Sequence, residues 1–168
     1  DGVTAMENFR VQLKDYQSLS DSTVLIAIKC IVHIVADFHC PTHMRFVDLH
    51  HEGKYPVTFL GESWNYHAVW DTGIVEAYHK GWDYKKYADH LNTLQDKQIK
   101  RITKGWAQDW FEDNCKYVRP IIYWTINDGK SVPSLDMSFV EKGGPIAENQ
   151  MQRAGYRLAA ALNTIFGN

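Results

Sequence analysis

The sequence has no excess of basic residues. It contains 18 Lys and Arg residues against 20 Asp and Glu residues, for a formal net charge of −2 at pH 7 and a pI near 6.5. A protein without a basic field does not bind nucleic acid through phosphate neutralisation alone. A polyanionic substrate would therefore have to be held by metal ions.

Paired cysteines and long apolar runs are also missing. Cys30, Cys40 and Cys115 are odd in number and show no Cys-x-x-Cys spacing, so the sequence predicts neither a disulfide framework nor a thiolate zinc site. Buried or unpaired thiols are the expected state. No stretch reaches about 18 consecutive apolar residues, the length of a membrane span, and residues 1–20 carry no signal-peptide pattern.

The residues that are present favour one folded domain with a real core. The chain has 168 residues and a mass of 19.4 kDa, with 45% hydrophobic and 13% aromatic residues. A chain of about 150 residues buries about two-thirds of its unfolded surface. No repeat or linker divides it, so we expect a single domain over residues 1–168.

Helix signals dominate the first half of the chain. Ser20 to Ser22 offer N-cap oxygens to a helix that ends near Phe38. Its expected core face consists of Leu25, Ile28, Ile31 and Val35, with His33 and Asp37 at the edge of that face. Residues 48–61 read as a loop with a short strand or hairpin at 57–60. A second helix is expected from about Ser63.

The second half also has a helical period. Apolar residues recur every three or four positions from Tyr84 to Trp110, which predicts two helices or one bent helix. Pro120 is expected to interrupt a further helix at 117–126, and residues 127–129 predict a turn. Gly143-Gly144-Pro145 is expected to open the last helix. The fold class is therefore mostly α, with a short β-hairpin.

Two histidine–aspartate pairs carry the chemistry of this sequence. His33 and Asp37, and likewise His67 and Asp71, are separated by four residues, which brings each pair onto one face of a helix. Either pair alone arises readily by chance on a helix surface. Pro41 ends the first helix, so that His43 can turn back toward the pairs. Together these side chains predict a multi-metal site.

Imidazole nitrogen and carboxylate oxygen are good ligands for zinc. His43, His67 and Asp71 supply three ligands for one ion. Asp37 has two oxygens, and could bind one ion with each and hold a pair of ions about 3.5–4 Å apart, with His33 completing one of them. Of the other histidines, His39 is expected to be a supporting or core group, and His79 and His90 are expected on the surface.

At these motifs the sequence resembles a known family. Residues 37–43 resemble an Asp-x-His-Gln-Pro-Leu-His signature, and residues 65–71 resemble an Asn-Leu-His-x-x-Trp-Asp signature. Both belong to the trinuclear-zinc single-strand nucleases of the S1/P1 type, which are related to zinc phospholipase C. Residues 57–61 and 154–163 resemble the strand and the terminal helix of that family. The resemblance implies its helical fold.

The resemblance also implies roles for individual residues. His33 would bind the first zinc, Asp37 would bridge the first and third zinc ions as the catalytic residue, and the remaining ligands would hold the second zinc: His43, His67 and Asp71. Water held by the metal ions would attack phosphorus. Three zinc ions occupy the complete family site, and only the second keeps its full ligand set in this sequence.

This sequence departs from the family pattern in two ways. The family begins with an N-terminal Trp and further His and Asp ligands, whereas this chain begins at Asp1 and corresponds to about the last three-fifths of the domain. We therefore expect an incomplete nuclease domain whose N-terminal segment, with its ligands, is missing. Cys40 and Thr42 also replace the Gln and Leu of the signature, which leaves the ligands unchanged.

The expected function is zinc-dependent hydrolysis of single-stranded DNA or RNA to 5′-nucleotides, with 3′-nucleotidase activity as a second reaction. The expected partners are single-stranded nucleic acid or nucleotides, and the resemblance implies a secreted or periplasmic protein. Two alternatives stay open. One is a phospholipase C-like phosphodiesterase, and the other is a non-catalytic helical fragment that binds metal.

Overall fold

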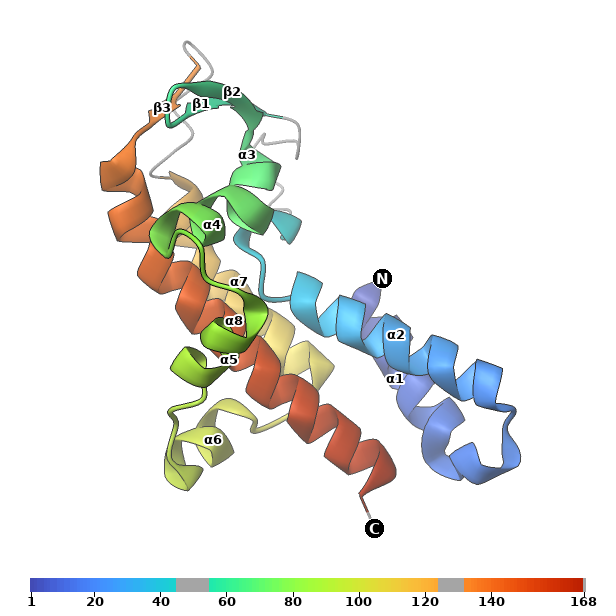
Figure 1. The fold of residues 1–168 in the computed structure, drawn as a ribbon. Coiled ribbons are helices and arrows are strands. Elements are labelled where there is room, and N and C mark those ends of the chain that lie inside the picture. The colour runs from blue at the N-terminus through green and yellow to red at the C-terminus, as the bar shows by residue number, and fades with distance from the viewer. Residues whose placement is uncertain (45–54, 124–131, 168) are drawn as a thin grey trace.

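The chain folds mainly into helices, as its sequence predicts. The structure, a computed structural model, describes residues 1–44, 55–123 and 132–167. Its α-helices are α1 (Gly2–Gln12), α2 (Asp21–Asp37), α3 (Tyr66–Ala68), α4 (Ile74–Tyr78), α5 (Tyr84–Leu91), α6 (Asp96–Ile102), α7 (Ala107–Tyr123) and α8 (Met137–Phe166). The strands are β1 (Pro56–Phe59), β2 (Glu62–Asn65) and β3 (Ser134–Leu135). Figure 1 shows the sheet at one end of the molecule and the C-terminus at the other. Within the described ranges, no helix is long and apolar enough to cross a membrane.

The first long helix, α2, begins where the sequence predicts. The Ser20 hydroxyl accepts a hydrogen bond from the amide of Thr23 at 3.3 Å, which caps the helix. Its buried stripe is Ala27, Ile31 and Val35, spaced by four residues. The expected core position of Leu25 is wrong, because a residue two positions before Ala27 lies on the far side of the helix, and Leu25 is 51% exposed.

The small sheet changes the expected start of the second metal-bearing helix. The strand order is β2-β1-β3, with β1 antiparallel to β2 and parallel to β3. Leu60 and Gly61 join β1 to β2 with φ of 51° and 88°, the backbone of a tight hairpin turn. Residues 62–65 therefore pair with β1, and the helix begins at Tyr66 instead of near Ser63. The predicted loop at 48–54 lies outside the described residues.

Residues 84–110, for which the apolar period predicts two helices or one bent helix, contain α5, α6 and the first turn of α7. The helical conformation ends after α5 and again before Gly105, whose φ of 85° is incompatible with a right-handed helix. The expected interruption at Pro120 is wrong, because α7 continues to Tyr123. The turn predicted at 127–129 lies outside the described residues.

The last helix begins earlier than the sequence predicts. Asp136 caps α8 by accepting a hydrogen bond from the amide of Ser138 at 2.9 Å, and the helix then runs through Gly143, Gly144 and Pro145. The two glycines permit close packing and do not break the helix. A side-chain carbon added at Gly143 would overlap the side chain of Ile74, and one added at Gly144 would overlap the ring of Tyr78. Short helix α4 thereby crosses α8 at close range.

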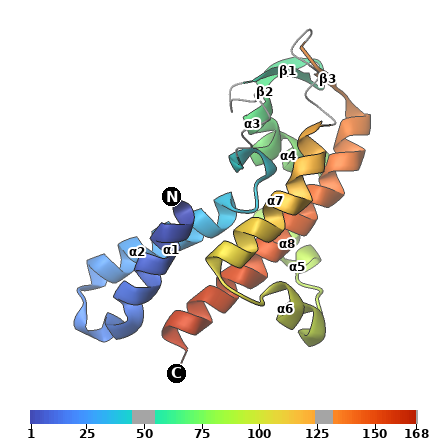
Figure 2. The ribbon, with the colours of Figure 1, turned by 180° about the vertical axis from the view of Figure 1, so that it is seen from behind.

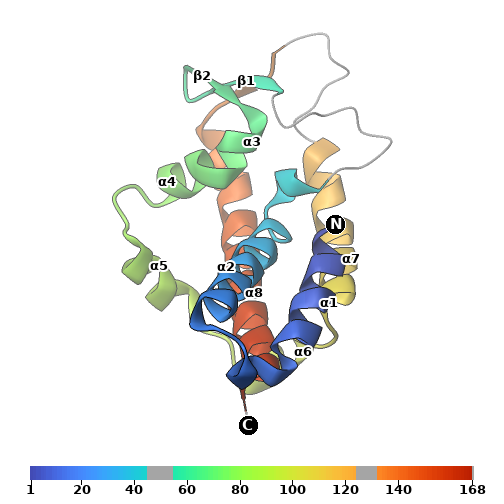
Figure 3. The ribbon, with the colours of Figure 1, turned by 90° about the vertical axis from the view of Figure 1, so that its right-hand side faces the viewer.

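Two hydrophobic clusters build the interior. One gathers residues of β1, α4 and the first turns of α8, among them Phe59, Ile74 and Val140. The other joins α1 and α2 to α7 and α8 through residues such as Met6 and Trp110. Phe111 packs against both clusters. Figures 2 and 3 show α7 and α8 linking the sheet end of the molecule to the end where α1 and α2 pack.

A buried polar network fixes the end of α2. The side-chain amide of Asn114 on α7 donates to the carbonyl of Phe38 at 2.9 Å. The amide of Gln150 on α8 donates to the carbonyl of His39 at 3.0 Å. Unpaired backbone groups are costly in an interior, so these two bonds determine where the chain leaves α2. They set the position of the turn that carries His43.

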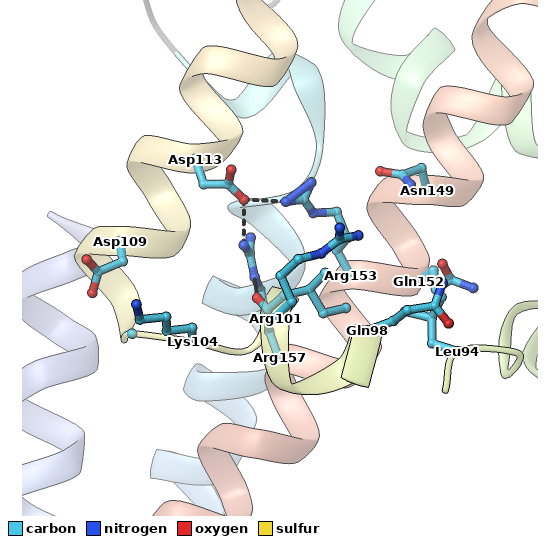
Figure 4. A pocket seen from close by; sticks show the side chains of 12 residues that line it. Leu94, Gln98, Arg101, Lys104, Asp109, Asp113, Asn149, Gln152, Arg153 and Arg157 are labelled. Carbon is cyan, nitrogen blue, oxygen red and sulfur yellow. Dashed lines mark hydrogen bonds and ion pairs between the residues drawn. The ribbon is translucent and has the colours of Figure 1, made fainter. Parts of the chain in front are cut away.

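The ring of His39 is part of the same network, as a supporting group. Its Nδ1 lies 2.7 Å from the carbonyl of Val35, and its Nε2 lies 3.0 Å from the guanidinium of Arg157. A guanidinium only donates, so Nε2 accepts and Nδ1 carries the single proton of a neutral ring. Arg157 also donates to Asp113 at 2.6 Å, and Arg153 contacts the same oxygen. Figure 4 shows both arginines of α8 converging on this carboxylate of α7.

The environment of His39 disfavours its protonation. Burial of the ring lowers the pKa of His39 from 6.5 to about 4. The hydrogen bond to Val35 and the charge of Asp113 act in the opposite direction, whereas the positive charges of Arg157 and Arg153 add to the lowering. The folded protein therefore keeps His39 neutral at any pH near 7.

We predict opposite effects for two glycine substitutions in α8. Gly144→Ala forces a carbon against the Tyr78 ring and should lower the free energy of unfolding by about 1–3 kcal/mol, the usual effect of overpacking. Gly155→Ala is the matched control, because nothing lies within 4 Å of the added carbon, and it should raise that free energy by about 0.5–1 kcal/mol. Urea unfolding monitored by circular dichroism measures both. A destabilising Gly155→Ala together with a neutral Gly144→Ala would contradict this packing.

We also predict that His39 makes the metal-free protein sensitive to acid. Between pH 6.5 and about 4 the unfolded chain binds a proton that the folded chain excludes, so stability is full above this window and is lost as the pH falls through it. The slope is about 1.4 kcal/mol per pH unit, or about 3 kcal/mol across the window. Urea unfolding with chelator present at several pH values should show this slope for the wild type and a shallower one for His39→Gln. Equal slopes would contradict the prediction.

Candidate metal centre

The five side chains singled out in the sequence come from separate elements. His33 and Asp37 lie on the last turns of α2. His43 ends the 3₁₀ turn Pro41–His43, whose position depends on the buried network described above. His67 lies on α3 and Asp71 on the π-helical turn Val69–Gly73 that follows α3. The structure brings all five together in one continuous chain of contacts.

Asp37 lies between two of the histidines. Its Oδ2 is 3.2 Å from Nε2 of His33, and its Oδ1 is 3.2 Å from Nδ1 of His43. The His33 side chain is 75% exposed and the Asp37 side chain 35%. The expectation that both lie at the edge of a buried face is therefore met only by Asp37, and His33 forms the solvent side of the cluster.

Asp71 makes the corresponding bridge at the other end of the cluster. Its Oδ1 is 3.1 Å from Nε2 of His43, and its Oδ2 is 2.8 Å from Nε2 of His67. The rings of His43 and His67 face each other, with centroids 4.5 Å apart. Both carboxylates thus use their two oxygens on different imidazoles, and His43 is the ring that they share.

The local backbone explains how His67 and Asp71 reach each other. Asn65, the last residue of β2, caps the next helix by accepting a hydrogen bond from the amide of Ala68 at 2.7 Å. The prediction from the sequence placed His67 and Asp71 on one regular α-helix, whereas Asp71 lies on a π-helical turn. Single π turns inside helices often occur at functional sites. The side chains still meet because the strand-to-helix junction orients His67.

The contacts of His43 fit a bound cation. Both of its ring nitrogens face a carboxylate oxygen, at 3.2 Å and 3.1 Å. A neutral imidazole has one N–H and one lone pair, so one nitrogen would direct its lone pair at a negative oxygen. A cation between that nitrogen and the carboxylate removes the repulsion and satisfies both groups. Imidazole and carboxylate are also the ligand types that zinc takes in proteins.

Cys40 is a group that the sequence patterns did not single out as part of this site. Its thiol donates to Oδ1 of Asp71 at 3.0 Å, and ligand atoms of Cys40, His43 and Asp71 lie within 4.8 Å of one another. Burial raises the pKa of the Cys40 thiol to about 12; a hydrogen bond to Thr42 opposes this shift and Asp71 adds to it. The sequence could have indicated this role, because Cys40 lies three residues before His43 in the same turn.

The cluster faces a cavity of about 400 Å³ between α2 and α8. Four of the five side chains line it, namely His33, Asp37, His43 and Asp71. Its opposite wall is formed by Ala147, Met151 and Ala154 of α8. A small molecule in this cavity would touch carboxylates and imidazoles on one side and apolar carbon on the other.

A larger cavity of about 720 Å³ lies elsewhere, among α6, α7 and α8 (Figure 4). Two of its cations, the partly buried Arg153 and the buried Arg157, are already paired with Asp113. It shares no residue with the histidine–aspartate cluster. The chemistry of the lining residues therefore favours the smaller cavity as the candidate site, although the other cavity is larger.

Comparison with known proteins agrees with the motifs. The family model for S1/P1 nuclease matches residues 2–167. The chain is 31% identical over 183 residues to nuclease S1 of Aspergillus oryzae, covering 97% of this chain and 61% of that protein. It is 26% identical to endonuclease 2 of Arabidopsis thaliana, with 97% and 61% coverage, and 28% identical to endonuclease 1 of the same plant, with 98% and 58% coverage.

The matched region includes every helix and strand described above and all five residues of the cluster. The chain spans about three-fifths of the length of these curated relatives. The family resemblance seen in the two motifs is confirmed by a match over nearly the whole chain. This protein belongs to the S1/P1 nuclease family.

Proposed function

We propose that this chain carries the core of a zinc-dependent phosphodiesterase that hydrolyses single-stranded DNA or RNA to 5′-nucleotides, with 3′-nucleotidase activity as a second reaction. One observation supports it above the others. Three imidazoles and two carboxylates from α2, a turn, α3 and a π-helical turn form an unbroken series of contacts of 2.8–3.2 Å beside a cavity.

Each residue has a distinct part in this proposal. His43, His67 and Asp71 would hold the second zinc ion, His33 would bind the first, and Asp37 would serve the first and third. Bound zinc would lower the pKa of water and neutralise phosphate charge. Asp37 is the proposed catalytic residue, because its position fixes the spacing between ions. Metal ions also explain how a chain with a net charge of −2 binds a polyanion.

The lining of the cavity supports this substrate class. The metal ligands on one wall suit a phosphate, and Ala147, Met151 and Ala154 on the other wall offer apolar contact to a base or sugar. Single-stranded nucleic acid and nucleotides present both groups together. Residues 1–168 belong to one nuclease domain in this proposal, and the natural protein is secreted or periplasmic like the family that it resembles.

One alternative applies to the 168-residue chain on its own. It spans 61% of nuclease S1 of Aspergillus oryzae, and in this sequence only the second zinc site has its full family ligand set. By itself the chain could bind metal without catalysing hydrolysis. Assaying the chain beside the complete natural gene product separates the two cases, since equal turnover by both would remove this alternative.

We predict that metal removal and loss of one ligand both abolish hydrolysis of single-stranded DNA by the natural protein. His67→Ala removes a ligand, so its effect should exceed the factor of about 10–100 that is typical of residues that only support ligands. Glu62→Gln on neighbouring β2 removes an exposed carboxylate and should leave turnover unchanged. Activity is measured as release of acid-soluble nucleotide, and bound zinc by elemental analysis.

Two results would reject the proposal. The first is hydrolysis that persists after chelation and dialysis, because the proposed reaction has no route without metal. The second is an active His67→Ala variant that binds as much zinc as the wild type. A variant that loses both zinc and activity but recovers neither with added zinc would still support the role of His67 as a ligand.

Phospholipid is the competing substrate, and we predict a clear preference against it. The natural protein should release nucleotides from single-stranded DNA at least tenfold faster than it releases phosphorylated head groups from phosphatidylcholine vesicles at equal phosphodiester concentration. Nucleic acid offers bases to the apolar wall of the cavity, and a choline head group does not. Faster release of head groups would replace the nuclease proposal with a phospholipase one.

A further inference from the structure

A second group of metal-ligand side chains lies outside the centre described above. His79 follows the last turn of α4, His90 lies in the last turn of α5, and Glu148 is on α8. Nε2 of His79 is 2.9 Å from Oε1 of Glu148, and Nε2 of His90 is 3.2 Å from the same oxygen. The three ligand atoms lie within 4.8 Å of one another. Two ligands thus come from the neighbouring segments around α4 and α5, and the third comes from α8, far along the chain.

The spacing of these atoms matches what a metal ion requires. Zinc binds histidine nitrogen and carboxylate oxygen at about 2.0–2.2 Å, so two ligands of a tetrahedral site lie about 3.3 Å apart. The two nitrogen–oxygen distances of 2.9 Å and 3.2 Å are close to that value. A small outward shift of Glu148 would make room for an ion.

The surroundings hold the ligands in place. The indole of Trp82 stacks on the ring of His79, with centroids 3.8 Å apart and planes 5° apart. Tyr87 meets the edge of the same ring at 5.7 Å between centroids. Ligand rings held by their neighbours bind metal with less loss of conformational freedom. The expectation that His79 lies on the surface is wrong, since its side chain is only 24% exposed.

The cluster also adds a contact between α5 and the rest of the protein. No residue of α5 is fully buried, so this helix has little hydrophobic anchoring to the rest of the protein. Its polar links to other elements include the Tyr87 hydroxyl, which donates to the carbonyl of Val75 at 2.7 Å, and the side-chain amide of Gln152 on α8, which donates to the carbonyl of Leu91 at 2.6 Å. The His90–Glu148 contact is a further link. An ion shared by His90 and Glu148 would tie α5 to α8.

We propose that His79, His90 and Glu148 form a separate site for a divalent transition metal ion, with zinc as the expected ion, that clamps α5 onto α8. Two neutral imidazoles and one carboxylate suit zinc, and a fourth position faces solvent on the side of His90, whose side chain is 45% exposed. The site shares no residue with the histidine–aspartate cluster. The competing state is a metal-free cluster in which both rings donate hydrogen bonds to Glu148.

Zinc counting tests the site directly. The natural protein and its variants are dialysed against the same free zinc concentration and analysed for bound zinc per chain. His90→Gln and Glu148→Gln should each bind one equivalent less than the wild type. Asp89→Asn, which removes an exposed carboxylate beside His90, should bind as much as the wild type. Equal zinc contents in all four proteins would overturn the proposal and leave the hydrogen-bonded cluster.

Hydrogen exchange tests the clamp in the wild-type protein, with His90→Gln as the control. Zinc added to the metal-free wild type should slow amide exchange in residues 84–91, by up to about a hundredfold at a hundred times the dissociation constant. The same addition to His90→Gln should leave exchange in these residues unchanged. Exchange in α5 that ignores zinc in the wild type would overturn the clamp.

The outcome is independent of the proposed nuclease function. The zinc count and the exchange measurement are repeated in His67→Ala, which lacks a ligand of the first centre. Retention of the zinc-dependent protection of residues 84–91 in this variant supports a separate site. Loss of that protection in His67→Ala would show that the effect comes from the first centre, and would overturn the proposal while leaving the nuclease function standing.

Discussion

The ring of His43 lies between the carboxylates of Asp37 and Asp71, and the rest of the centre depends on this arrangement. A neutral imidazole offers one proton, so two flanking carboxylates leave one unfavourable contact that a cation removes. The two aspartates come from different helices, and they converge on one ring only while α2, the 3₁₀ turn and the β2–α3 junction keep their relative positions. Binding of a cation and maintenance of the fold are therefore coupled at this ring.

The buried network at the end of α2 maintains those positions. Asn114 and Gln150 bind the carbonyls of Phe38 and His39, and Arg157 fixes the His39 ring while its own charge is balanced by Asp113. Buried hydrogen bonds of this kind favour one geometry of the chain, because removal of one member leaves a desolvated group without a partner. Side chains of α7 and α8 thus help to position the turn Pro41–His43, which belongs to neither helix.

Local signals predicted the fold best where a side chain acts on its own neighbours. The Ser20 cap and the helix ending near Phe38 are confirmed, because capping depends on residues within one turn. The helix start predicted at Gly143 and Gly144 is wrong. These glycines instead permit close contact with Ile74 and Tyr78, about seventy residues away. A short strand or hairpin was predicted, but the residues from about Ser63 were assigned to the following helix. Residues 62–65 form β2 because they pair with β1, and their short sequence alone does not predict a strand.

The sequence by itself determined the candidate ligand types, the spacing of four residues within each histidine–aspartate pair, and the family, because these follow from residues close together in the chain. Only the tertiary structure decided which oxygen faces which nitrogen, that Cys40 approaches Asp71, and that His79 and His90 meet Glu148. The contacts of Cys40 and Glu148 join residues 31 to 69 positions apart. Their formation depends on how α8 packs against the rest of the chain, which is set by the summed burial of many apolar side chains and not by any motif.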